Sequence, residues 1–103
     1  MSDRRNYERH LIRKFALLKL TNGDTFKGQT RDMSMGGAFV ECDSAISLAE
    51  GTECTIYLTL REGEEELVTE IYGSICRSDS QGLGFNFLKI NSTYYQFMNA
   101  LYE

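Results

Sequence analysis

Short runs in which apolar and polar residues alternate dominate the chain, as is typical of β-strands that bury one face. The clearest run places Cys54, Ile56, Leu58 and Leu60 on one face. Asn-Gly at 22–23 is suited to a tight hairpin. Strands are expected at residues 15–20, 25–31, 38–42, 54–60, 67–78 and 83–87. Many short strands separated by turns predict a small antiparallel barrel.

The last segment of the chain changes to a helical period. Asn91 or Ser92 is a suitable N-cap, because either side chain can accept a hydrogen bond from a backbone N–H of the first turn. Apolar residues then recur at i, i+3, i+4 and i+7, namely Tyr94, Phe97, Met98 and Leu101. These positions predict a helix over about residues 91–102, whose apolar stripe packs on the sheet or covers an end of the barrel. A surface for dimer formation is the alternative.

The composition is that of a small globular protein. Of 103 residues, 42% are hydrophobic and 25% are charged, a balance that suits one modest core. No apolar run is long enough to span a bilayer, and the charged N-terminal segment lacks the apolar stretch of a signal peptide. We therefore expect one domain in a cytoplasmic protein without a membrane span.

The three cysteines do not form a metal-binding or disulfide pattern. Cys42, Cys54 and Cys76 are widely separated, no pair forms C-x-x-C, and the single histidine, His10, is far from them in the sequence. Since a zinc site needs about four ligands at closer spacing, we expect reduced thiols and no metal.

Charge is distributed unevenly along the chain. The formal net charge is −4, which disfavours a general nucleic-acid-binding protein. Five of the eleven basic residues nevertheless lie in the first fourteen positions: Arg4, Arg5, Arg9, Arg13 and Lys14. A basic N-terminal segment before an acidic body indicates a local site for an anion. A solvated terminal tail is the alternative explanation.

Arg5 and Arg9 within this segment form an R-x-x-x-R pattern. A guanidinium group donates paired hydrogen bonds to phosphate oxygens, and its plane stacks on a purine ring. Two arginines spaced in this way on an arm can approach a compact nucleotide from two sides. The pattern alone is weak, because two arginines often occur at this spacing by chance.

A second polar pattern, D-x-S-x-x-G, follows the second expected strand and consists of Asp32, Ser34 and Gly37. A carboxylate can accept hydrogen bonds from the N–H groups on the Watson–Crick edge of guanine, which adenine does not present in that arrangement. The small hydroxyl of Ser34 can reach a base or a phosphate, and Gly37 permits close backbone approach or a positive φ angle. An ordinary turn uses the same residue types, so this pattern alone has two explanations.

The two patterns, in this order, resemble those of the PilZ domain family, whose members bind the bacterial second messenger cyclic di-GMP. Other parts of the chain are also similar to the family. They are Gly36–Val40 (G-G-A-hydrophobic), Gly51 before the next strand, Gly73–Arg77 (G-x-V-x-R with Ile75 in place of Val) and Gly82–Phe87 (G-x-G-hydrophobic-x-F). The resemblance therefore extends over nearly the whole chain.

The resemblance implies a fold and a domain organisation. The fold would be all-β with one helix: a six-stranded antiparallel PilZ-type β-barrel, split-barrel-like, with a C-terminal α-helix. Residues 1–12 would form a flexible N-terminal arm that carries the arginine pattern, and residues 13–103 a single barrel domain. The D-x-S-x-x-G pattern would lie on the connection between the second and third strands.

The resemblance also implies roles for the residues of both patterns. Arg5 and Arg9 would hold the phosphates and stack on guanine. Asp32 and Ser34 would read the guanine edge, and Gly37 would shape the turn. Cyclic di-GMP would be the ligand, and no other cofactor is expected.

Three further residues are weaker candidates for ligand contact: Arg4, Gly36 and Arg77. In the family, an arginine directly before the first motif arginine is associated with an intercalated pair of ligand molecules, whereas a solvated Arg4 is the alternative. Gly36 adjoins the last residue of the second pattern. Arg77 is expected either beside the site, on a neighbouring strand, or in a surface ion pair. His10 directly follows the arginine pattern and is interpreted as a flanking loop residue.

These features predict a cyclic di-GMP receptor or adaptor that orders its N-terminal arm on binding and signals through an unidentified downstream protein. We expect a monomer or a weak homodimer. A PilZ-like adaptor that does not bind nucleotide is the alternative, although such members usually lack the arginine pattern. An enzyme is not expected, because Ser34 has no plausible base near it in sequence and His10 is the only histidine. The acidic body and the lack of a basic-aromatic groove disfavour an OB-like binder of RNA or of single strands.

Overall fold

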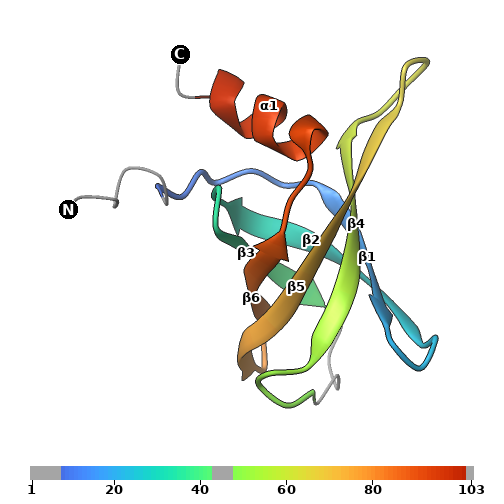
Figure 1. Ribbon diagram of the computed structural model, residues 1–103, viewed down its shortest axis with the longest axis vertical. Coiled ribbons are helices and arrows are strands. Elements are labelled where there is room, and N and C mark those ends of the chain that lie inside the picture. The colour runs from blue at the N-terminus through green and yellow to red at the C-terminus, as the bar shows by residue number, and fades with distance from the viewer. Residues whose placement is uncertain (1–7, 43–47, 102–103) are drawn as a thin grey trace.

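The computed structural model describes residues 8–42 and 48–101, which form a closed barrel with one helix at its end (Figure 1). The strands follow the order β1-β2-β3-β6-β5-β4 around the barrel, and every neighbouring pair is antiparallel. The expected six-stranded antiparallel barrel with a C-terminal helix is confirmed. The elements are β1 (Phe15–Leu20), β2 (Thr25–Met33), β3 (Gly37–Cys42), β4 (Glu53–Arg61), β5 (Leu67–Asp79), β6 (Gly82–Lys89) and α1 (Ser92–Ala100).

Alternate residues of each strand fill the interior of the barrel. On β4, Cys54, Ile56, Leu58 and Leu60 are at most 1% exposed, so the face predicted from their alternation is confirmed. Each large apolar side chain that is fully buried contributes about 1.5–3 kcal/mol to folding, so this interior is the main source of stability. The other members of the core are Ala16, Leu18, Met33, Ala38, Val40, Ile71, Ile75, Leu83, Phe85, Tyr94 and Met98.

The helix α1 packs its apolar stripe on the barrel, as predicted. Its N-cap is Asn91, whose side-chain oxygen accepts a hydrogen bond of 2.9 Å from the N–H of Tyr94. Tyr94 and Met98 are fully buried, and Phe97 is partly buried against the core. The last position of the predicted stripe is wrong. Leu101 is 38% exposed, because the helix ends before it and the residue lies in the turn beyond.

The strand β2 is longer than its sequence pattern indicates. It was expected to end at Arg31 but continues to Met33, so Asp32 is a strand residue. Its pairing with β3 shifts by one residue between Thr30 and Asp32, which is a β-bulge with Arg31 as the extra residue. A bulge interrupts strict alternation, and the alternating pattern therefore stops before the strand does.

The segment before β1 is attached to β2. His10 and Met33 exchange two backbone hydrogen bonds of 2.8 and 2.9 Å. Oγ1 of Thr30 accepts a hydrogen bond from the N–H of Lys14 (2.8 Å) and donates one to the carbonyl oxygen of Ile12 (2.6 Å). The last part of the expected arm therefore lies along the barrel. Residues 1–7 are outside the described residues, and the flexibility of the arm stays a prediction.

The thiols of Cys42, Cys54 and Cys76 are free, as expected. Burial raises the pKa of Cys54 from 9.0 to about 11, and proximity to Cys42 adds to this effect. Within residues 8–42 and 48–101, no helix is both long and apolar enough to cross a membrane. In the same part of the chain, His, Cys, Asp and Glu side chains form no group of three or more that could hold a metal ion.

Candidate functional site

The two sequence patterns meet at the end of β2. The backbone bridge between His10 and Met33 places the preceding residue, Arg9, beside the end of β2. Nη1 of Arg9 lies 2.5 Å from Oδ1 of Asp32. The side chain of Asp32 is 9% exposed, whereas that of Arg9 is 54% exposed. An arginine of the first pattern and the carboxylate of the second therefore form an ion pair that is open to solvent on one side.

The β-bulge places a second arginine next to the same carboxylate. Arg31 donates a hydrogen bond of 3.3 Å from Nε to Oδ2 of Asp32. Its guanidinium carbon also lies 4.0 Å from the centroid of the Phe39 ring, at the distance of a cation–π contact. Because two consecutive residues of a bulge oppose one residue of the partner strand, Arg31 and Asp32 both lie beside Phe39. Each oxygen of the carboxylate thus has its own arginine.

Arg77 approaches the same aromatic ring from β5. Phe39 pairs with Gly84 on β6, and Gly84 pairs with Arg77. A Cβ atom at Gly84 would lie 3.2 Å from Cβ of Arg77 and 3.6 Å from Cδ1 of Phe39, so the glycine leaves room for both side chains. The guanidinium carbon of Arg77 lies 4.9 Å from the ring centroid. Arg77 therefore lies beside the site, as one of the two alternatives expected.

The other alternative for Arg77, a surface ion pair, is also present. Its Nε donates to Oδ2 of Asp79 at 3.0 Å. Oδ1 of Asp79 accepts hydrogen bonds from the N–H groups of Gln81 (2.8 Å) and Gly82 (3.2 Å). The hydrogen bond from Gln81, supported by Arg77, lowers the pKa of Asp79 below its usual value. The charged carboxylate anchors Arg77, and the lowered pKa lets it keep its charge to a lower pH than an ordinary aspartate.

Ser34 is used by the connection between β2 and β3. Its Oγ accepts hydrogen bonds from the N–H groups of Gly36 (3.2 Å) and Gly37 (3.1 Å), and it lies 3.2 Å from the carbonyl oxygen of Gly37, to which it can donate. The residue is only 3% exposed. In this geometry the hydroxyl shapes the turn, and the expected contact of Ser34 with guanine stays a prediction.

Gly37 is required by a neighbouring strand. It is the first residue of β3, and a Cβ atom there would lie 2.2 Å from the carbonyl oxygen of Phe85. Of the two reasons considered for a glycine, close backbone approach is the one that applies. The approaching backbone belongs to β6.

The helix α1 is tied directly to this connection. The hydroxyl of Tyr94 donates a buried hydrogen bond of 2.6 Å to the carbonyl oxygen of Ser34. The ring of Tyr94 also makes an edge-to-face contact with Phe87, with centroids 5.4 Å apart. Sequence reasoning assigned Tyr94 only to an apolar stripe, and its hydroxyl contact was missed because nothing in the periodicity indicates it.

Two other members of the site were missed from the sequence. Phe39 alternates with Ala38 and Val40, which are buried inside the barrel, so alternation alone could have placed its ring outside. Arg31 carries no such signal, because the bulge sets its direction. Arg4 and Arg5 lie outside the described residues. Gly36 is half-buried in the bend before β3, and its ligand contact stays a prediction.

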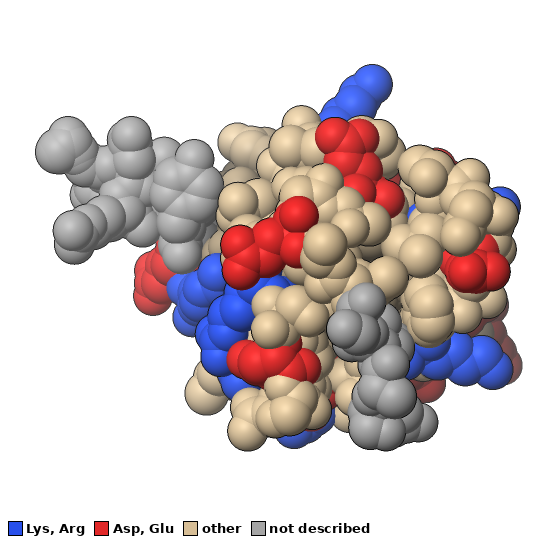
Figure 2. Space-filling model, turned by 90° about the horizontal axis from the view of Figure 1, so that it is seen from below, with Lys and Arg blue, Asp and Glu red and all other residues tan. Residues whose placement is uncertain are grey.

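Basic and acidic side chains lie next to one another on the surface seen from below the view of Figure 1 (Figure 2). Three ion pairs agree with this pattern: Arg13–Glu41 at 3.0 Å, Arg31–Asp32 at 3.3 Å and Arg77–Asp79 at 3.0 Å. Because carboxylates already pair with these arginines, an anionic ligand has to compete with them.

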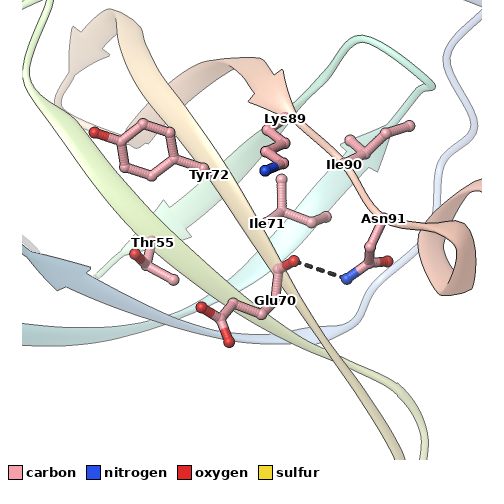
Figure 3. A pocket seen from close by; sticks show the side chains of 7 residues that line it. All are labelled: Thr55, Glu70, Ile71, Tyr72, Lys89, Ile90 and Asn91. Carbon is pink, nitrogen blue, oxygen red and sulfur yellow. Dashed lines mark hydrogen bonds between the residues drawn. The ribbon is translucent and has the colours of Figure 1, made fainter.

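A separate hollow of about 280 Å³ lies at the β4–β5 face, next to the segment that joins β6 to α1 (Figure 3). The side-chain amide of Asn91 crosses one side of it and donates to the carbonyl oxygen of Glu70 at 2.9 Å. None of the residues that line it belongs to either sequence pattern. They are Thr55, Glu70, Ile71, Tyr72, Lys89, Ile90 and Asn91.

Comparison with known proteins agrees with the barrel fold. The model of the PilZ domain family matches residues 3–103. A comparison with curated proteins found no match. The structure of the Bacillus subtilis inhibitor of motility (MotI/DgrA) is similar with a TM-score of 0.78 at 16% identity, over 92% of this chain and 47% of that chain. The present chain thus spans about half the length of that protein.

Two further solved structures are PilZ domains. That of CeSA from a cellulose-synthesizing bacterium has a TM-score of 0.69 at 24% identity, over 91% of this chain and 93% of that chain. The PilZ domain of YcgR from Escherichia coli, with cyclic di-GMP, has a TM-score of 0.68 at 22% identity, over 95% of this chain and 88% of that chain. These likenesses establish the barrel fold.

Proposed function

The chain belongs to the PilZ domain family, and on this premise we propose that it is a receptor for cyclic di-GMP that signals through a partner protein. The observation that carries the proposal is the ion pair between Arg9 and Asp32, because it brings the arginine of one pattern and the carboxylate of the other to one surface. The PilZ domain of YcgR, which is similar in fold, has a structure with this ligand.

Recognition would proceed by an exchange of partners at Asp32. Oδ1 of Asp32 accepts a hydrogen bond from Arg9 in the structure. A cyclic dinucleotide offers phosphate oxygens to Arg9 and, in a guanine, N–H donors to the carboxylate that Arg9 leaves. Each charged group loses one charged or polar partner and gains another, so neither is left buried without a contact. We assign Arg5 to the same phosphate-binding role.

The connection between β2 and β3 would keep its shape during binding. The hydrogen bonds of Ser34 to Gly36 and Gly37 fix this turn beside Asp32. A rigid turn favours affinity, because less conformational entropy is lost on binding. In the proposal, Arg4 supports a second, intercalated ligand molecule.

Signalling would use the elements attached to the site. Ligand contact orders the arm, while the hydrogen bond from Tyr94 to Ser34 keeps α1 attached to the rigid turn beside the site. A downstream protein would then read the arm and α1 together. In this proposal the domain binds and signals and performs no catalysis.

Calorimetric titration with cyclic di-GMP, and with cyclic di-AMP as comparison ligand, tests the proposal. We expect saturable binding of cyclic di-GMP with a clear preference over cyclic di-AMP. Arg9→Ala should weaken binding more than about tenfold, because a hydrogen bond to a charged group contributes about 1.5–3 kcal/mol. Two ligands per chain would support the role given to Arg4.

Arg13→Ala is the matched control for Arg9→Ala. Arg13 is another exposed arginine before β1, but it pairs with Glu41 and Gln29 away from Asp32. If both variants weaken the binding of cyclic di-GMP equally, Arg9 contributes only its positive charge and no specific contact. No binding by the wild-type protein would overturn the receptor proposal and favour an adaptor that acts through proteins alone.

A further inference from the structure

We propose that Arg31 is a positioning residue that determines specificity: it holds the carboxylate of Asp32 in place when Arg9 leaves it for the ligand. This inference rests on the proposed function and deepens it. Arg31 belongs to neither sequence pattern, and its role follows from the structure around the bulge.

The two arginines of Asp32 differ in how they are held. Arg9 comes from the segment before β1 and its side chain is 54% exposed. Arg31 is part of β2 itself and its side chain is 33% exposed. Arg9 contacts Oδ1 and Arg31 contacts Oδ2. The more exposed arginine is the one that can exchange its partner, and the strand arginine is the one that stays.

The guanidinium of Arg31 is fixed by its surroundings. It lies 4.0 Å from the ring centroid of Phe39, and its Nη1 lies 3.5 Å from Oε1 of Gln81. Phe39 is only 3% exposed and is contacted by Arg77 as well, so the ring is a firm support. The rotation of Arg31 about its long side chain is therefore restricted while Asp32 is bound to it.

A fixed Arg31 has a direct consequence for selectivity. With Oδ2 held, the carboxylate of Asp32 cannot rotate freely when Oδ1 loses Arg9. Guanine and adenine differ at this point in the N–H donors that they present, so discrimination depends on where Oδ1 points. Phosphate contacts are the same for both ligands and do not depend on this orientation. Loss of Arg31 should thus reduce the preference for guanine more than the binding of the phosphates.

The test compares the dissociation constants of cyclic di-GMP and cyclic di-AMP in Arg31→Gln, Arg31→Lys and the control Arg13→Gln. We expect the preference for cyclic di-GMP to fall about tenfold in Arg31→Gln and nearly as far in Arg31→Lys. Lysine keeps the charge but has neither the planar group that stacks on Phe39 nor the forked donors. Arg13→Gln should leave the preference unchanged. A full preference in Arg31→Lys would overturn the proposal, because charge alone would then suffice.

A double-mutant cycle separates positioning from direct ligand contact. If Arg31 acts through Asp32, Arg31→Gln should have no further effect on affinity in an Asp32→Ala background. An equal loss in both backgrounds would show that Arg31 touches the ligand itself and would overturn the positioning role. No binding by the wild-type protein would instead contradict the proposed function.

A measurement on the unliganded protein tests the contact without any nucleotide. In ¹H–¹⁵N spectra of arginine side chains, we expect the Nε–H of Arg31 to exchange slowly with water. This protection should be lost in Asp32→Ala and kept in Arg9→Gln. Its loss in Arg9→Gln would overturn the inference, because Arg31 would then not hold the carboxylate independently.

Discussion

The interior of the barrel and the outer surface around Asp32 are built on the same strands but by different means. Inside, many apolar side chains share the burial, and no single atom pair decides the packing. Outside, the site depends on individual contacts, such as Arg9 with Asp32 and Arg31 with Phe39. The interior therefore supplies stability with some redundancy, whereas in the proposed function the outer surface supplies specificity through a few individual contacts.

The bulge on β2 separates the two regions at a single point. Thr30 and Met33 are fully buried inside the barrel, while Arg31 and Asp32 between them face its outer side, where Asp32 is covered by Arg9 and Arg31. One extra residue in the strand thus allows two consecutive polar side chains to leave the core. Changes on either side of this boundary should affect different measurements.

The largest effect on stability is expected inside the barrel. Leu58 is fully buried, and Leu58→Ala should lower the free energy of unfolding by about 2–5 kcal/mol through lost burial and a residual cavity. Urea unfolding measures this loss. The fraction that stays folded should bind cyclic di-GMP with unchanged affinity. A changed affinity in the folded fraction would break the separation between the two regions.

A smaller effect is expected where the regions join. Tyr94→Phe removes the donor to the buried carbonyl oxygen of Ser34, which should cost about 1–3 kcal/mol in unfolding free energy. The matched control is Tyr95→Phe on the same helix, where the side chain is half-exposed and little change is expected. Ligand affinity should fall only in Tyr94→Phe, because the turn loses its tie to α1. Equal stability of both variants would contradict this link.

A still smaller effect on stability is expected at the site itself. Asp32→Ala should change the unfolding free energy by about 1 kcal/mol or less, because both arginine partners reach solvent and ion pairs of this kind contribute little. The same change should abolish the preference for cyclic di-GMP. A loss of stability as large as that of Leu58→Ala would mean that Asp32 is a structural residue first.

The last effect is expected only at alkaline pH and is negligible near neutral pH. The pKa of Cys54 is raised from 9.0 to about 11 in the folded protein. The thiol therefore ionises first in the unfolded state, and stability should fall as pH rises from about 9 to about 11. The measurement is the unfolding midpoint as a function of pH across this range. The midpoint should fall less steeply with pH in Cys54→Ala than in the control Cys76→Ser, which changes an exposed cysteine. Identical slopes would show that the thiol is not shielded.

The sequence predicts the barrel well because its information is periodic. Alternation along β4 and the helical stripe at Tyr94 and Met98 record which side chains face the core. The resemblance of two polar patterns added the identity of the fold and the expectation that Arg9 and Asp32 serve one binding site. These features depend on residue type and spacing, which a sequence shows directly.

The rest of the site could not be predicted from the sequence, because it depends on places where the strands depart from regular alternation and on backbone geometry. The direction of Arg31 follows from a bulge, and the room for Arg77 beside Phe39 follows from the pairing of Gly84 with both strands. The use of the Ser34 hydroxyl inside its own turn likewise depends on backbone geometry. None of these changes the spacing of apolar residues.

The most direct test of where the ligand binds is an NMR titration of the unmodified protein with cyclic di-GMP. We predict that the largest amide shifts fall at residues 9–10 and 31–39, where the two patterns meet. The hollow lined by Thr55, Tyr72 and Lys89 should show only small shifts. The largest shifts in that hollow, with the Asp32 region unchanged, would contradict the assignment of the binding site.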